Sequence, residues 1–85
     1  MLLKNKGGTV TLFAFSKGEG LSEHTAPFDA LVHVIEGEAE IGIQGETALE
    51  NFQVRAGEII TLPANRAHAV KATTDFKMLL MMIRA

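Results

Sequence analysis

The feature that most constrains the fold of this 85-residue chain is a period-two alternation of apolar and polar residues, interrupted repeatedly by glycine, asparagine and proline. Such alternation is typical of strands that bury one face, whereas an amphipathic helix places apolar residues three or four positions apart. The segments 9–15, 30–35 and 39–43 show the pattern clearly. About seven short strands are therefore predicted, with no helix of normal length, in an all-β antiparallel double-sheet barrel or sandwich.

Three local signals refine this prediction. Pro27 holds Ala26 in an extended conformation, so the segment 23–28 is expected to be a strand with a break. The sequence Gln44-Gly45-Glu46 predicts a tight turn between two strands. Asn65 is expected to adopt a positive φ angle, because asparagine tolerates this conformation better than other non-glycine residues.

Length and composition predict one domain covering residues 1–85. Of the residues, 47% are hydrophobic, which is enough for one core. A domain of this size buries only about two-thirds of its unfolded surface, so we expect a homodimer to supply further burial. Strand-like sequence begins almost at Met1, which leaves open that an N-terminal strand of the domain is missing.

Charge and composition argue against several classes of partner. The net charge is −2 and the eight Lys and Arg residues are dispersed, so no basic surface for nucleic acid is expected. The absence of cysteine excludes disulfides and thiolate metal sites. The apolar run at 78–83 has six residues, against about twenty needed to cross a bilayer, so it predicts a core strand and not a membrane partner. A soluble cytoplasmic protein is expected.

Two segments carry a recognisable motif. Gly57 is followed by Pro63, a turn residue and His68, and upstream His24 precedes Gly37 in a turn. This arrangement resembles the two conserved motifs of the cupin family, in the family's order and over nearly the whole chain. The resemblance implies a small jelly-roll barrel, a fold that hosts metal enzymes, isomerases, storage domains and ligand-sensing modules.

The resemblance also implies a metal site with four ligand positions, here occupied by His24, Ala26, Ala30 and His68. A methyl group has no lone pair, while catalytic first-row metals usually take at least three protein ligands. The two histidines could hold only Zn, Ni or Cu, and weakly, so no cofactor is certain. Iron or manganese chemistry, which depends on a carboxylate, is disfavoured.

Other chemistry-bearing residues have ordinary structural interpretations. His33 alternates with Ala30, Val32 and Val34, so it is expected to lie on the outer face of its strand or at a subunit contact. The methionines 78, 81 and 82 are interpreted as core residues, with the lining of a ligand pocket as the alternative.

The favoured function is a small-molecule-binding or sensing module, with His24 and His68 at the mouth of a mostly apolar barrel pocket that takes a small organic ligand. The predicted lining comprises His24, Phe28, Val32, His68, Val70, Met78 and Met82. The main alternative is a small metal-dependent enzyme of oxygenase, isomerase or decarboxylase type with an incomplete two-histidine site. Metal-free acid–base catalysis by one histidine and a purely structural dimer module are further alternatives.

Overall fold

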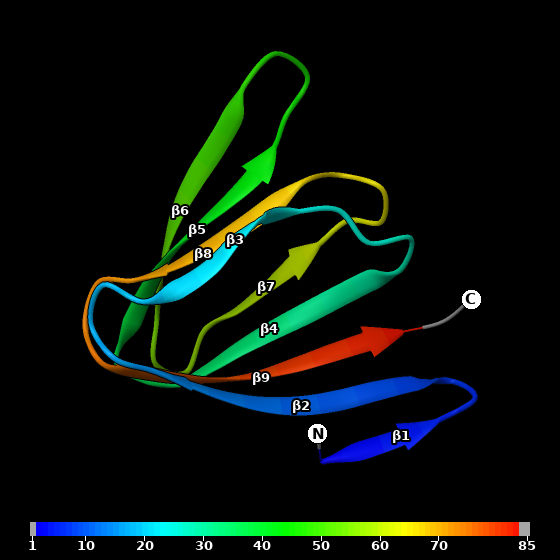
Figure 1. Cartoon of the computed structure of the whole chain (residues 1–85), viewed down its shortest axis with the longest axis horizontal. Helices are drawn as coiled ribbons and strands as arrows, with labels where there is room; N and C mark the ends of the chain where they lie inside the picture. The colour runs from blue at the N-terminus through cyan, green and yellow to red at the C-terminus, as the bar shows by residue number, and fades with distance from the viewer. Residues whose placement is uncertain (1, 84–85) are drawn as a thin grey trace.

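The computed structural model describes residues 2–83, and all regular structure in this range is β (Figure 1). The expectation of an all-β chain is therefore confirmed. The nine strands are β1 (Leu3–Asn5), β2 (Gly8–Phe15), β3 (Gly20–His24), β4 (Asp29–Glu36), β5 (Glu38–Gln44), β6 (Leu49–Arg55), β7 (Ile59–Leu62), β8 (His68–Ala72) and β9 (Phe76–Ile83).

The strands form two sheets that pack face to face, as in a double-sheet barrel. The first sheet has five strands in the order β1-β2-β9-β4-β7, and the second has four in the order β3-β8-β5-β6. Every strand pair is antiparallel. The chain crosses between the sheets several times, so segments distant in sequence lie side by side, such as β3 beside β8 and β2 beside β9 (Figure 1).

The core lies between the two sheets and follows the alternation in the sequence. In β4, Ala30, Val32 and Val34 are buried, while Leu31 and His33 alternate with them and are half-buried. Because successive side chains of a strand point to opposite faces, His33 lies on the outer face of the five-stranded sheet. The expectation for the face of His33 is thereby confirmed.

The turns also follow the predicted chemistry. Asn65 has a φ angle of 64°, which confirms the prediction of a positive φ at this residue. Gly37, between β4 and β5, has a φ angle of 71°. A Cβ atom there would collide with the main-chain oxygen of Asp75 and would lie 2.7 Å from the hydroxyl oxygen of Thr74. Glycine is thus required at position 37 by both conformation and space.

Two details differ from the sequence prediction. There are nine strands instead of about seven, and one of them is the short strand β1, which forms a hairpin with β2. The interrupted segment at 23–28 is strand only as far as His24, and regular pairing resumes at Asp29. The loop between them contains Pro27, which has no N–H group to donate to a ladder.

Candidate functional site

His24 and His68, 44 residues apart in the sequence, are brought together by the pairing of β3 with β8. His24 is the last residue of β3 and His68 the first of β8, and their Cα atoms are direct partners in the ladder. The register shifts between Leu21 and His24, so a bulge precedes the histidine. The ring centroids are 4.3 Å apart at an interplanar angle of 75°, and the two Nε2 atoms are 3.0 Å apart.

The hydrogen bonds around the pair define which nitrogen carries the proton when each ring is neutral. Nδ1 of His24 lies 2.7 Å from the main-chain oxygen of Ser22, which can only accept, so Nδ1 of His24 carries the proton. In a neutral ring Nε2 of His24 is then an acceptor, and Nε2–H of His68 donates to it. This leaves Nδ1 of His68 as a buried acceptor without a hydrogen bond of ordinary geometry.

Burial sets the charge of His68. His68 is 6% exposed, whereas His24 is exposed to solvent. Burial lowers the pKa of His68 below its ordinary value of 6.5, and the neighbouring His24 lowers this pKa further. The main chain of Arg66 acts in the opposite direction but lies outside hydrogen-bond geometry from Nδ1. His68 is therefore neutral at neutral pH, as the hydrogen-bond assignment requires.

The two alanines of the first motif follow His24 closely in the chain. Ala30 is 4% exposed on the inner face of β4, between its partners Leu62 and Met82. Ala26 is half-buried, and its main-chain oxygen accepts a hydrogen bond of 2.8 Å from the N–H group of Asn65. Both positions are structurally integrated, but neither side chain can bind a metal.

The donor set does not fit a resident catalytic metal ion. Two imidazole nitrogens converge, and among residues 2–83 no group of three or more His, Cys, Asp or Glu side chains is placed to hold a metal. A catalytic zinc site takes three protein ligands and keeps a fourth position for water or substrate. The chain supplies two.

The remaining residues of the predicted lining differ in accessibility. Val32 and Met78 are completely buried, and Val70 is 5% exposed, so these three belong to the packed core. Phe28 and Met82 are half-buried. Of the predicted lining, only His24, Phe28 and Met82 are therefore accessible to solvent to a substantial degree.

Three residues near the pair were not singled out from the sequence. Ile43 is the Cα partner of both His68 and Glu50, so His24, His68, Ile43 and Glu50 form one row across the inner face of the four-stranded sheet. Glu50 is about two strand spacings, roughly 10 Å, from His68. Phe52 lies on the same inner face and is 40% exposed. The alternation in β6 could have placed Glu50 and Phe52 on the same face of their strand. Their partners in β5 could not be predicted, because the sequence does not specify the register between the two strands.

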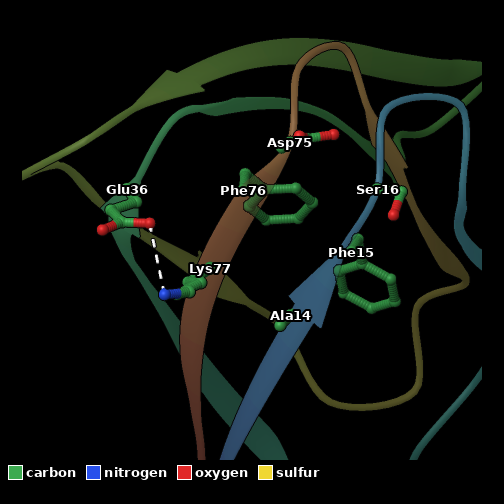
Figure 2. A pocket seen from close by; sticks show the side chains of 7 residues that line it. All are labelled: Ala14, Phe15, Ser16, Glu36, Asp75, Phe76 and Lys77. Carbon is green, nitrogen blue, oxygen red and sulfur yellow. Dashed lines mark ion pairs between the residues drawn. The ribbon is translucent and has the colours of Figure 1, made fainter.

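A hollow of about 230 Å³ lies where the end of β2 meets the start of β9 (Figure 2). It is lined by Ala14, Phe15, Ser16, Glu36, Asp75, Phe76 and Lys77. Nζ of Lys77 lies 3.4 Å from a carboxylate oxygen of Glu36, and Asp75 accepts a hydrogen bond from the N–H group of Lys17, which precedes β3. No motif in the sequence indicated this hollow, and it shares no residue with the histidine pair.

Comparison with known proteins identifies the family. A model of the cupin domain matches residues 11–84. A conserved protein of unknown function from Streptococcus pyogenes is 33% identical, with a TM-score of 0.88 over 99% of this chain and 70% of that one. A cupin superfamily protein from Desulfitobacterium hafniense is 26% identical, with a TM-score of 0.88 over 99% of this chain and 73% of that one.

A cupin 2 conserved barrel domain protein from Leptotrichia buccalis is 43% identical, with a TM-score of 0.86 over 98% of this chain but only 38% of that longer one. No protein of curated function matches the chain. Within residues 2–83 there is no helix of the length and apolarity that a membrane crossing requires. The domain match over 11–84, together with these likenesses, shows that the chain belongs to the cupin family.

Proposed function

We propose that this cupin binds a small organic molecule at the His24–His68 pair and acts as a binding or sensing module. The observation that carries the proposal is the pair itself: two imidazoles in contact, one exposed and one buried, at the end of the inner face. His24 is exposed, so a ligand can reach the paired Nε2 atoms from solvent, and a few polar atoms of this kind beside apolar surface are typical of small-molecule sites.

The hydrogen-bond assignment defines the kind of polar group that the ligand carries. Nε2 of His24 accepts and Nε2–H of His68 donates, so a group with both a donor and an acceptor can replace the direct contact between the rings. A hydroxyl, a neutral carboxylic acid or a primary amide has this property. Binding of such a ligand costs little hydrogen-bond energy, because the one hydrogen bond between the rings is replaced by two hydrogen bonds to the ligand.

The surroundings favour an apolar body on the same ligand. Ile43 is half-buried beside His68, and Phe52 is 40% exposed on the inner face. The methyl groups of Ala26 and Ala30 replace larger polar side chains and leave the site less polar. Small-molecule sites are commonly apolar with few polar groups that fix the orientation of the ligand.

Ligand-observed NMR with a set of small phenols, hydroxy acids and primary amides tests the proposal. Wild type and His33→Ala, which removes a histidine on the outer face, are expected to bind the same members of the set. His24→Ala removes the accepting nitrogen from an exposed position and is expected to abolish that binding. Retention of binding in folded His24→Ala protein would place the ligand elsewhere and refute the proposal.

The second candidate is a metal-dependent enzyme that uses the two histidines for Zn, Ni or Cu. One observation favours it: both Nε2 atoms face each other 3.0 Å apart, and imidazole is a suitable ligand for these metals. Isothermal titration with zinc and with nickel sulfate, repeated on His24→Ala, separates the two candidates. Stoichiometric binding that depends on His24 favours the metal protein, and weak or absent binding favours the small-molecule module.

A further inference from the structure

The inner face of the β5–β6 ladder is covered at one end and open at the other. Cross-strand pairs lie on this face in succession: Ala39 with Val54, Ile41 with Phe52, and Ile43 with Glu50. The first pair is buried, whereas Phe52 is 40% exposed and Glu50 is exposed. In Figure 1 the turn end of β5 and β6 extends away from β4 and β7 of the facing sheet. The open end of this face therefore lies in the same row as the histidine pair and is accessible to solvent.

Glu50 brings a negative charge to an inner surface that otherwise lacks Asp, Glu, Lys and Arg residues. This holds for the inner faces of β2 and of β4 to β9, which the ladder registers define. Within residues 2–83 the carboxylate of Glu50 has no hydrogen bond or ion pair. A carboxylate attracts positively charged groups, and an ammonium group forms charge-assisted hydrogen bonds with it. The open end of the face is therefore suited to a cation.

Phe52 adds a second group that attracts a cation. It follows Glu50 by two positions in β6, so both side chains project from the same face, with their Cα atoms about 7 Å apart. The face of an aromatic ring attracts an ammonium group that lies within about 6 Å of its centroid. An ammonium group that is bound to the carboxylate of Glu50 can therefore contact the exposed ring of Phe52 as well.

The row across the sheet sets the length of a ligand that contacts both ends. Glu50 is two strand spacings, roughly 10 Å, from His68, and Ile43 lies between them. A polar hydrogen bond at each end places the ligand atom about 3 Å from its protein partner. The two polar ends of the ligand are then roughly 5–10 Å apart. Ile43 is half-buried, so it can pack against an apolar body between these ends.

The position of Glu50 on an edge strand has a second interpretation. β6 is the last strand of the order β3-β8-β5-β6, and an inward-pointing charge on such a strand can discourage pairing with another chain. Edge protection requires neither an aromatic ring beside the carboxylate nor a histidine pair in the same row. The combination of these features favours a ligand that contacts all of them.

We propose that the small molecule bound at the His24–His68 pair is a cationic amine. Its hydroxyl or amide end bonds to the two histidines, its apolar body lies over Ile43, and its ammonium group contacts Glu50 and Phe52. This inference rests on the proposed function and adds the charge class of the ligand. An anionic ligand of the same shape would instead be repelled by Glu50.

Ligand-observed NMR with three phenols of similar shape tests the charge class. Tyramine carries an ammonium group at the end opposite its hydroxyl, para-ethylphenol carries no charge, and para-hydroxyphenylpropanoate carries a carboxylate. Wild type is expected to bind tyramine at least about fivefold more tightly than para-ethylphenol, because an exposed ion pair and a cation–π contact each add affinity. The propanoate should bind most weakly. High salt should reduce the preference for tyramine, because interactions between exposed charges are screened.

Glu50→Gln keeps the size of the side chain and removes its charge, so it should lower the affinity for tyramine to that for para-ethylphenol, whose own affinity should not change. Glu40→Gln makes the same change on the outer face of β5, opposite Lys71 and Gln53, and should leave all three affinities unchanged. Far-UV circular dichroism establishes that both variants are folded.

Equal binding of the three phenols to wild type would overturn this inference and leave the proposed function standing. An undiminished preference for tyramine in folded Glu50→Gln protein, or failure of tyramine to bind where another hydroxy or amide compound binds, has the same meaning. If no compound of either set binds to wild type, the proposed function itself fails, and this inference fails with it.

Discussion

Replacing Gly37 with alanine should destabilise the fold more than the same change at Gly57, and the difference can be worked out from the structure. Both glycines have positive φ angles, 71° and 89°. They are also neighbours in space: the N–H group of Ala56 donates to the oxygen of Gly37, and that of Gly57 donates to the oxygen of Val34. An alanine at either site pays about 1–2 kcal/mol for the left-handed conformation.

Only position 37 adds a steric term. A Cβ atom at Gly57 has no neighbour within 4 Å, whereas at Gly37 it lies 2.7 Å from Thr74 Oγ1 and 2.9 Å from the Cβ of Phe76, besides the collision with Asp75. Overpacking of this kind typically costs about 1–3 kcal/mol. Gly37→Ala should therefore lower the free energy of unfolding by about 2–5 kcal/mol and Gly57→Ala by about 1–2 kcal/mol.

Urea titration followed by far-UV circular dichroism measures both variants, since the chain has no tryptophan for fluorescence. If the free energy of unfolding falls with urea concentration at the same slope in wild type and in both variants, the urea midpoints report differences in stability. A loss at Gly37→Ala no larger than that at Gly57→Ala would refute the steric argument and the tight approach of the β4–β5 turn to β9.

Three further results are expected. The free energy of unfolding should fall as the pH drops below about 6.5, because the pKa of His68 is lower in the folded chain than in the unfolded chain and protonation therefore favours unfolding. Urea midpoints at several pH values measure this pH dependence, which should be weaker in His68→Gln. Ala26→His combined with Ala30→Glu should create a site with four donors that binds nickel stoichiometrically in calorimetry. Ala30→Glu alone should lower the free energy of unfolding, because position 30 is only 4% exposed. Equal nickel affinity in wild type and in the double variant would contradict the account of the missing ligands. Met78→Ala should cost about 2–5 kcal/mol in urea, since its side chain is completely buried, and a smaller loss would indicate that the core collapses around it.

Much of the fold followed from the sequence because the relevant signals are local. Alternation identified the strand at 30–35 and the face of His33, and the tolerance of asparagine for positive φ identified the turn at Asn65. The cupin motifs aligned His24 with His68, and the structure places their Nε2 atoms 3.0 Å apart.

The features that sequence did not reveal depend on register and on long-range pairing. The row that contains Glu50 exists only because β6 pairs with β5 at Gln44 opposite Leu49. The accessibility of the predicted lining depends on how closely the two sheets approach, and Val32 and Met78 proved to be fully enclosed. The tautomers of the two histidines depend on the main-chain oxygen of Ser22, which contacts His24. The residue type at position 22 does not indicate such a main-chain contact.

That last contact has a consequence for how the site can change over time. His24 is oriented by the carbonyl group of Ser22, not by its hydroxyl group. Every amino acid has a carbonyl group, so most substitutions at position 22 should preserve the orientation of the ring. Position 22 is exposed and free to vary with respect to this contact, whereas the bulge before His24 must be kept. The orientation of His24 is thus protected against most single substitutions at position 22.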